Sequence, residues 1–258
     1  MTVSVGGGIW WALLLAAVAL AVAIGAARAP LERRWGGASP CRFRRRFLAG
    51  LAGLSVAWLC IYKVLLWAVT DYPFFFWNEL PLQPCNVVAL LSVPAALLQG
   101  RTARPLRAFC FYGGIVFSLA AMALPVEGFY EIPLLSVNAI GFYGFHGLVL
   151  VVAVSLASWD LYRPSFGDTP GVLLQLTLLG GAVHLVNLLL RATVFPQASY
   201  FYTCGLEGNP VLEWLLELIP VYFLFELPLL LLMALFCGCI TLLWRLGRRL
   251  LSTRLPAL

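Results

Sequence analysis

Eight side chains that can ionise or form strong hydrogen bonds stand inside long apolar stretches of this sequence. They are Lys63, Cys85, Asn86, His146, His184, Asn187, Glu217 and Glu226. A membrane interior makes such groups costly to bury, so each is a candidate for function. We therefore begin from the chemistry that these residue types permit and then turn to the helices that must position them.

A cysteine with a histidine can carry out acyl transfer. The histidine removes the thiol proton, and the acyl group then passes through a thioester on sulfur. The stretch LPLQPC, residues 80–85, places a proline where the first turn of a helix tolerates it. Cys85 would then lie near a helix N-terminus, where the helix dipole favours a thiolate. Asn86 and backbone N–H groups there could stabilise an oxyanion.

The same side chains also have structural interpretations. Lys63 could extend along its apolar stem to the membrane surface. Asn86, Asn138 and Asn187 could join helices through hydrogen bonds. A cysteine in an apolar helix often packs as a small hydrophobic group. The histidines and Glu226 could be satisfied inside the protein, and Glu217 could lie at the interface.

Seven apolar stretches are long enough, or nearly so, to cross a membrane as helices, which need about 20 residues. They are Ile9–Ala27, Phe47–Val69, Leu82–Leu98, Leu106–Leu124, Val137–Ala157, Val172–Phe195 and Leu215–Leu243. The first could instead be a signal peptide, but it lacks a basic leading segment, which favours a retained helix. The last could tilt or kink at Pro220 or Pro228.

Composition supports one integral membrane domain over residues 1–258. The chain is 62% hydrophobic and only 11% charged, whereas soluble domains carry roughly 25% charged residues. The net charge of +6 arises from short basic clusters between apolar runs, which argues against nucleic-acid binding. The seven cysteines show no zinc-type spacing and no disulfide framework is expected.

Charge placement predicts the orientation. In a seven-span topology, 15 of the 17 basic residues fall on one side, chiefly in the connection 28–46 and in the tail. The positive-inside rule then places the N-terminus outside and the C-terminus in the cytoplasm. The fold prediction is an all-α polytopic bundle of about seven transmembrane helices in a multi-pass membrane protein, at the plasma membrane if the source is bacterial.

Depth and helical phase predict a shared polar region in the middle to outer half of the membrane. At 1.5 Å per residue, Glu226 is expected at mid-depth in the last span. Three sets share a helix face by spacing: His184, Asn187 and Arg191; Tyr143 and His146; Tyr222 and Glu226. Such faces could line a cavity or simply pack inward.

Three stretches resemble the YwaF-like integral membrane proteins, which include eukaryotic transmembrane acyltransferases that make polyunsaturated ether phospholipids. They are LPLQPCNV (residues 80–87), FHG (145–147) and SYFYTCGLEGNPVLEW (199–214). The resemblance spans about residues 50–245. Gln83 and Ser199 stand where bacterial relatives often have histidine and asparagine.

The resemblance implies that Cys85 is the nucleophile and His146 the base of an acyltransferase acting on phospholipids or lysophospholipids. No cofactor or metal is expected. Substrate-binding candidates are Asn86, His184, Asn187, Glu226, Lys63 and Tyr143. Membrane lipids are then the expected partners, and the sequence gives no indication of oligomeric state.

Two non-enzymatic hypotheses stand beside this one. In a small-solute or proton-coupled transporter, Lys63, His146, His184 and Glu226 would form a path, although no inverted repeat is evident. In a membrane scaffold, the polar residues would only join helices. Metal binding is a minor idea, because the available ligands come from different helices.

Overall fold

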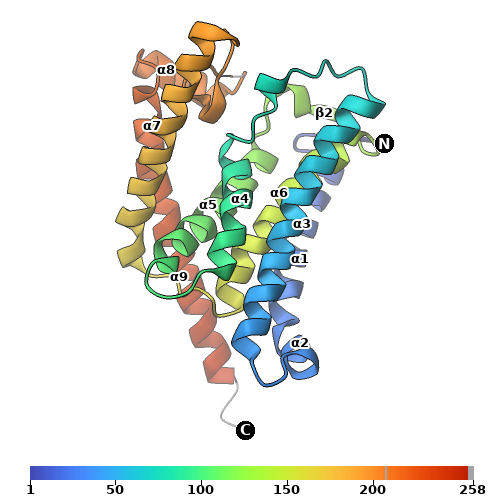
Figure 1. The fold of residues 1–258 in the computed structure, drawn as a ribbon, viewed down its shortest axis with the longest axis vertical. Coiled ribbons are helices and arrows are strands. Elements are labelled where there is room, and N and C mark those ends of the chain that lie inside the picture. The colour runs from blue at the N-terminus through green and yellow to red at the C-terminus, as the bar shows by residue number, and fades with distance from the viewer. Residues whose placement is uncertain (207, 255–258) are drawn as a thin grey trace.

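The computed structural model describes residues 1–206 and 208–254 as a bundle of helices that run between two ends of the molecule (Figure 1). The α-helices are α1 (Gly8–Ala26), α2 (Arg28–Trp35), α3 (Pro40–Val69), α4 (Pro84–Leu97), α5 (Ala103–Ala123), α6 (Val137–Ser158), α7 (Thr169–Thr193), α8 (Pro210–Leu218) and α9 (Leu227–Arg254). The 3-10 turns are η1 (Phe76–Asn78), η2 (Glu127–Phe129), η3 (Phe166–Asp168), η4 (Tyr200–Tyr202) and η5 (Leu224–Glu226). Strands β1 (Thr2–Ser4) and β2 (Glu131–Pro133) pair antiparallel, with Val3 opposite Ile132.

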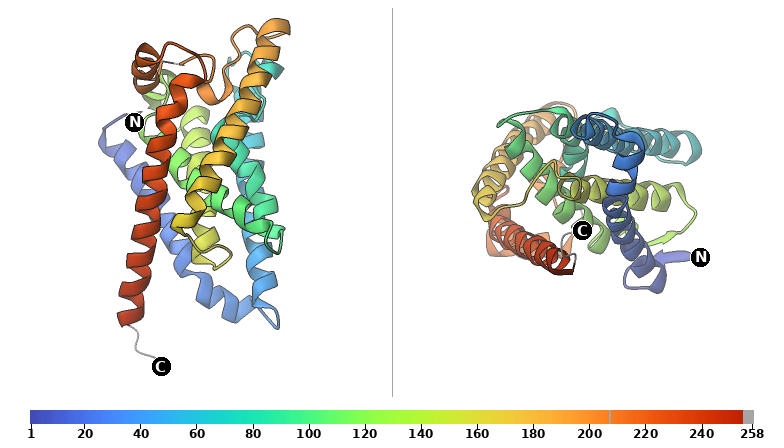
Figure 2. Two further views of the ribbon diagram at one scale, coloured as in Figure 1. Left: turned by 90° about the vertical axis from the view of Figure 1, so that its left-hand side faces the viewer. Right: turned by 90° about the horizontal axis from the view of Figure 1, so that it is seen from below.

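The predicted polytopic helical bundle is confirmed. Within the described residues, six helices are long and apolar enough to cross a membrane, and α4 is a shorter apolar helix of 14 residues. At 1.5 Å per residue α4 rises only about 21 Å, less than the ~30 Å of a hydrocarbon core. The N-terminus and the C-terminal end of α9 lie at opposite ends of the bundle (Figures 1 and 2). Which end faces the cytoplasm stays a prediction.

The last predicted span, residues 215–243, is broken at Pro220, one of the two prolines at which a kink was expected. Helix α8 ends at Leu218 and α9 begins only at Leu227. Pro220 explains the break, because proline has no N–H to donate and forces the residue before it out of helical geometry. Ile219 accordingly has φ −129° and ψ 87°. Glu217 therefore belongs to a separate helix, and Tyr222 and Glu226 do not share a helix face.

The second predicted span begins earlier than expected. Helix α3 starts at Pro40 rather than at Phe47. Proline is well suited to the first turn of a helix, because that turn needs no N–H donor there. The arginines between residues 42 and 46 thus lie on the helix and not in a loop.

Helix α6 lies at the centre of the bundle and packs against α1, α3, α4 and α5. Seen from below, α1 and α3 lie to one side and α7 and α9 to the other (Figure 2). Two glycines of α6 permit the close approach of α3. A Cβ at Gly141 would overlap the Tyr62 ring, and one at Gly144 would come within 2.7 Å of the Trp58 ring. Trp58 Nε1 also donates to the Gly141 carbonyl at 3.3 Å.

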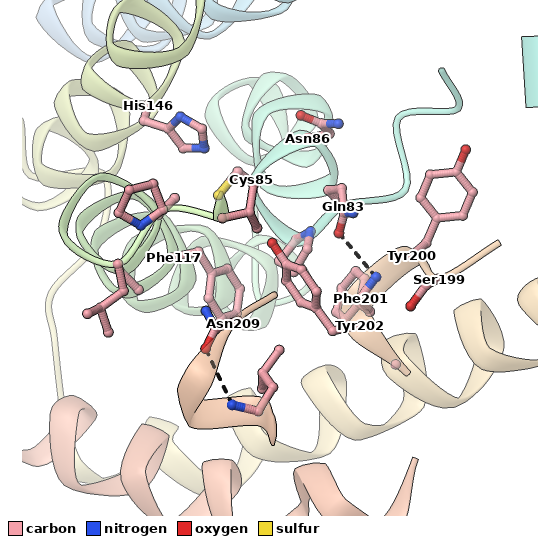
Figure 3. A pocket seen from close by; sticks show the side chains of 18 of the residues that line it. Gln83, Cys85, Asn86, Phe117, His146, Ser199, Tyr200, Phe201, Tyr202 and Asn209 are labelled. Carbon is pink, nitrogen blue, oxygen red and sulfur yellow. Dashed lines mark hydrogen bonds between the residues drawn. The ribbon is translucent and has the colours of Figure 1, made fainter. Parts of the chain in front are cut away.

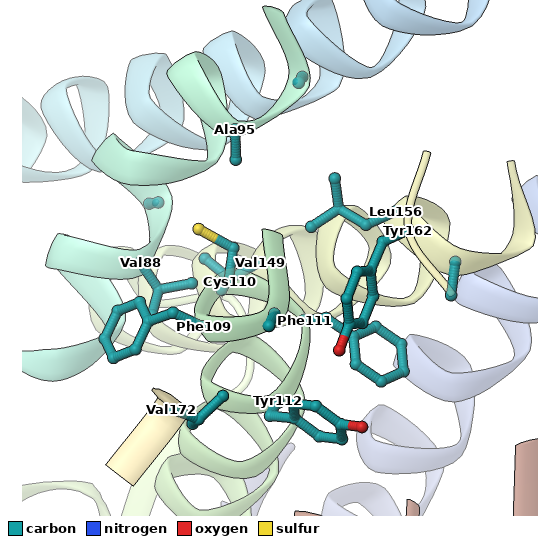
Figure 4. Packing of buried hydrophobic residues seen from close by; sticks show 14 of the residues in the cluster. Val88, Ala95, Phe109, Cys110, Phe111, Tyr112, Val149, Leu156, Tyr162 and Val172 are labelled. Atoms are coloured by element: carbon teal, nitrogen blue, oxygen red, sulfur yellow. The ribbon is translucent and has the colours of Figure 1, made fainter. Parts of the chain in front are cut away.

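Aromatic side chains fill the main core between α4, α5 and α6 (Figure 4). Phe109, Phe111 and Tyr112 are almost fully buried on α5. The Tyr112 hydroxyl lies 2.6 Å from Thr241 Oγ1 on α9, which ties α5 to the last helix. Packing of this kind fixes α4 against α5 and α6, and so positions the first turn of α4.

Arginines and carboxylates form a network of ion pairs at the end of the bundle where α2 lies. Arg28 contacts Glu32 at 3.0 Å and Asp160 at 2.5 Å, and Arg44 also pairs with Glu32. Arg248 on α9 approaches Asp160 to 3.6 Å. The hydrogen bond from Arg44 holds the pKa of Glu32 below its ordinary value. The connections around α1, α3, α6 and α9 thereby share one ionic cluster.

Candidate active site

A cavity of about 670 Å³ lies between α3–α6 on one side and α7, η4 and α9 on the other. Ligand pockets commonly measure about 300–1,000 Å³, so this one can hold a sizeable molecule. Most of its lining side chains are apolar, as an acyl chain would require. Its polar or ionisable lining residues are Tyr62, Lys63, Tyr72, Asn78, Gln83, Cys85, Asn86, His146, Thr177, Gln197, Ser199, Tyr200, Tyr202, Asn209 and Glu226.

Cys85 lies in the first turn of α4, directly after Pro84, and its side chain is 8% exposed. Gln83 has extended backbone geometry, φ −66° and ψ 149°, and forms the N-cap. The first amides of a helix have no carbonyl partner within it. The N–H groups of Cys85 and Asn86 therefore lie near the thiol at a partially positive helix end. The predicted position of Cys85 at a helix N-terminus is confirmed.

His146 enters the same cavity from α6. Its Nδ1 lies 2.8 Å from the Phe142 carbonyl oxygen. A carbonyl can only accept, so Nδ1 carries the hydrogen and a neutral ring keeps its lone pair on Nε2. The Phe142 ring packs against the imidazole at 4.4 Å between centroids. His146 is thus held by its backbone and an aromatic neighbour in the tautomer that can remove a proton.

Cys85 and His146 face the same space from neighbouring helices (Figure 3). No hydrogen bond joins the two side chains in the part of the chain that the structure describes. Catalytic hydrogen bonds are often long before substrate binds and shorten in the complex. The arrangement therefore brings a thiol, an imidazole and the first amides of α4 to one largely apolar cavity.

Gln83 connects the start of α4 to the loop across the cavity. Its Oε1 accepts a hydrogen bond from the Phe201 N–H at 3.2 Å (Figure 3). Phe201 and Tyr202 have positive φ angles of 58° and 61°, which cost energy for side chains of this size. The surrounding hydrogen bonds must hold them in place. Sequence reasoning recorded Gln83 only as a departure from a family pattern and did not identify Phe201.

Asn187 on α7 hydrogen-bonds to the loop that contains Phe201. It is fully buried, and its Nδ2 donates to the Tyr200 carbonyl at 2.7 Å and to Thr203 Oγ1 at 2.8 Å. Its Oδ1 accepts from the Tyr200 N–H at 3.0 Å. Asn187 was predicted to face inward on α7, and it does so because it hydrogen-bonds to the loop that contains Tyr200 and Thr203. Asn187 does not line the cavity among the described residues; it holds the segment that does.

His184 lies outside the cavity as well. Its Nδ1 is 3.5 Å from Cys204 Sγ, and its ring stacks on Phe223 at 5.2 Å between centroids. His184, a substrate-binding candidate from the sequence, is therefore not part of the cavity lining among the described residues. Phe223, which has a positive φ of 68°, stacks on this histidine and itself lines the main cavity.

Tyr143 lines a second, smaller hollow of about 390 Å³ between α1, α3 and α6. It is one helical turn from His146, but the two side chains serve different cavities. Spacing by three residues places two side chains on similar faces, separated by about 60° from the 3.6-residue repeat. In a closely packed helix, that difference is enough to direct the two side chains into different cavities.

Glu226 lines the main cavity from the side of α9, but at the end of that helix rather than at mid-depth. The depth prediction was wrong because the helix starts at Leu227 instead of Leu215. Its Oε1 is buried, and no hydrogen-bond partner is found for it within the described residues. Glu226 thus contributes a largely buried carboxyl group to the wall of the cavity.

Lys63 lines the cavity from α3, and its Nζ forms an ion pair with Glu79 Oε2 at 2.6 Å. Five of the predicted site residues thus meet at this cavity: Lys63, Cys85, Asn86, His146 and Glu226. Tyr143, His184 and Asn187 do not line it within the described part of the chain. Asn209, which was not anticipated, does; its Oδ1 caps α8 by accepting from the N–H of Val211 at 3.1 Å (Figure 3).

Comparison with known proteins gives one match. No curated protein and no solved structure matches the chain. The model of the TMEM164 family matches residues 4–237. This range includes all the residues that line the cavity and all the predicted site residues. This integral multi-pass membrane protein belongs to the TMEM164 family.

Proposed function

We propose that the chain is a membrane-embedded acyltransferase that acts on phospholipids and lysophospholipids through Cys85 and His146. The observation that carries the proposal is that both side chains line one largely apolar cavity. The tautomer of His146, defined by its bond to the Phe142 carbonyl, leaves Nε2 as the base. The resemblance of three sequence stretches to YwaF-like proteins, with their eukaryotic acyltransferases, points the same way.

In the first half-reaction, Cys85 Sγ attacks the carbonyl carbon of an acyl ester. The thiol proton passes to His146 Nε2 as the C–S bond forms, because a standing thiolate is poorly solvated in an apolar cavity. The carbonyl electron pair moves to oxygen, where the N–H groups of Cys85 and Asn86 can stabilise it. Collapse breaks the ester C–O bond, and the leaving alkoxide takes the proton from His146.

The second half-reaction reverses these steps with a different alcohol. His146 Nε2 removes the proton of the acceptor hydroxyl, whose oxygen attacks the thioester carbon. Collapse breaks the C–S bond, and the sulfur recovers the proton from His146. The acyl group has then moved between two hydroxyl groups without net change in oxidation state or protonation, and no cofactor is needed.

The test is intact-mass spectrometry of purified protein incubated with phospholipid or acyl-CoA. The native chain is expected to gain one fatty-acyl mass, and Cys85→Ala is expected to gain none. His146→Ala should accumulate the adduct at least about tenfold more slowly, since a positioned base commonly contributes about 10²–10⁴-fold. Retained acyl transfer in both variants would overturn the assignment.

The chain offers a matched control. Cys204 is another buried cysteine, and its Sγ lies 3.5 Å from Nδ1 of a histidine, His184, but neither residue lines the main cavity within the described part of the chain. Cys204→Ala should therefore form the adduct as the native chain does. If Cys204→Ala removes the adduct and Cys85→Ala does not, the nucleophile has been misassigned.

A further inference from the structure

The lining of the main cavity includes Lys63, one member of an ion pair that can be exchanged. Lys63 is the only lysine in the sequence. Its Nζ lies 2.6 Å from Glu79 Oε2, and the lysine side chain is 33% exposed whereas that of Glu79 is 8% exposed. The amine is thus the more accessible partner. It lies on a flexible four-carbon stem, which can swing away from the carboxylate.

Glu79 would remain hydrogen-bonded if Lys63 left it. The Tyr72 hydroxyl donates to Glu79 Oε1 at 2.5 Å, and Asn78 Nδ2 lies 3.3 Å from the same oxygen. Burial, together with the bond to Glu79, raises the pKa of Tyr72 to about 12, so the phenol keeps its donor hydrogen at neutral pH. Breaking a buried ion pair is costly mainly when it strands an unpartnered charge. The two remaining donors contact Oε1 and reduce that cost, whereas Oε2 would lose its partner among the described residues.

Lys63, Tyr72 and Asn78 also line the cavity that contains Cys85. Lys63, in the last third of α3, is a cationic donor in a lining that is mostly apolar. The Asn78 amide already donates to the Tyr72 hydroxyl at 2.9 Å and lies 3.3 Å from Glu79 Oε1. An ammonium group is a common partner for phosphate oxygens. A lipid with its acyl chain in the apolar part would bring its phosphate to Lys63.

We propose that Lys63 is a phosphate-binding residue for the lipid substrate, with Glu79 as the internal anion that it leaves when the lipid binds. The inference rests on the proposed function for the identity of the ligand as a substrate. It goes further by assigning phosphate recognition to one exchangeable ion pair. The phosphate belongs to a lipid headgroup rather than to free phosphate, because the cavity behind the amine is apolar.

The single lysine makes a direct binding test possible. Reductive ¹³C-methylation of the Cys85→Ala chain labels only Lys63 and the N-terminal amine, and the latter serves as an internal control. Lysophosphatidylcholine with an oleoyl chain should shift the Lys63 resonance and leave the N-terminal one unchanged. Monooleoylglycerol, which has the same chain without phosphate, should not shift it. Neither should inorganic phosphate at the same concentration.

Single-residue variants test how each charge affects the affinity for the lysophospholipid. Lys63→Met should weaken binding of the lysophospholipid about tenfold while leaving monooleoylglycerol binding unchanged. Glu79→Gln should strengthen lysophospholipid binding, because a neutral amide competes less for the amine. Arg101→Met, which removes an exposed cation remote from the cavity lining, is the matched control and should bind as the parent does.

Each outcome decides the point. Equal shifts of the Lys63 resonance with the phospholipid and the neutral lipid, or no shift with either, would overturn the proposal. A shift with inorganic phosphate alone would overturn the lipid assignment and leave a small-anion site. Because the readout is binding to a chain without the Cys85 thiol, these results do not depend on whether acyl transfer occurs. A thioester at Cys85 with no response at Lys63 would sink only the phosphate subsite.

Discussion

The support of the cavity loop by Asn187 allows a stability prediction with a worked magnitude. Asn187→Leu keeps a similar side-chain volume but removes three hydrogen bonds, two to the Tyr200 backbone and one to Thr203. Net values are about 1 kcal/mol for a hydrogen bond in a protein and about 0.6 kcal/mol on average within membranes. The loss should therefore be roughly 2–3 kcal/mol.

The assay is thermal unfolding of the purified protein in detergent, followed by tryptophan fluorescence. A change of 2–3 kcal/mol corresponds to a fall in Tm of about 4–12 °C, using the ~2–4 °C per kcal/mol of domains of 150–250 residues. Asn138→Leu, at an exposed asparagine near the start of α6, should shift Tm by less than about 2 °C, as surface substitutions usually do.

Equal Tm values for Asn187→Leu and Asn138→Leu would refute the reasoning, because they would mean that the loop is held by other contacts. A normal Tm for Asn187→Leu with a tenfold loss of lipid binding would also contradict it, since the proposed effect of Asn187 on the cavity acts through the stability of the loop.

Three further predictions follow from the packing and charge of the bundle. Gly144→Ala would place a methyl group against the Trp58 ring and should lower the free energy of unfolding by about 1–3 kcal/mol. Gly238→Ala, which has open space at its Cβ, is the control and should be neutral or stabilising in the same thermal assay. Arg107→Lys should lower Tm clearly, because the guanidinium donates to three carbonyl oxygens at 2.6–2.9 Å and one ammonium cannot reproduce that fork; an unchanged Tm would contradict this. The lowered pKa of Glu32 contributes stability that is present above the ordinary glutamate pKa of ~4.3 and is lost as the pH falls through the lower pKa of the folded state. Tm should therefore fall more steeply on acidification in the native chain than in Glu32→Gln. Parallel curves of Tm against pH would show that the ion pairs of Glu32 do not stabilise the fold.

Local chemistry accounts for what the sequence predicts well about the site. The prolines before Cys85 indicate a helix start, because proline suits the first turn, and α4 begins at Pro84. A histidine within an apolar run indicates a functional or hydrogen-bonded group, and His146 is bonded to its own backbone one turn earlier. These features depend on residues close together in the chain, and so they can be read from its order.

Long-range contacts decide the features that the sequence does not predict. Gln83 bonds to Phe201 across 118 residues, and the Tyr200 hydroxyl to the Trp77 carbonyl across 123. No spacing rule relates such positions, because their distance depends on how α4 and α7 pack. The same holds for Tyr143 and His146, which share a helix but line different cavities.

The sequence by itself determined that this protein crosses a membrane several times, because about 20 consecutive apolar residues have few other stable environments. It also indicated Cys85 and His146 as a pair capable of chemistry. Only the tertiary structure decided that these two, with Lys63 and Glu226, line one cavity, and that His184, Asn187 and Tyr143 lie behind or beside it. Hydrophobicity specifies which segments enter the membrane, but the rotation of each helix about its axis depends on close packing with its neighbours.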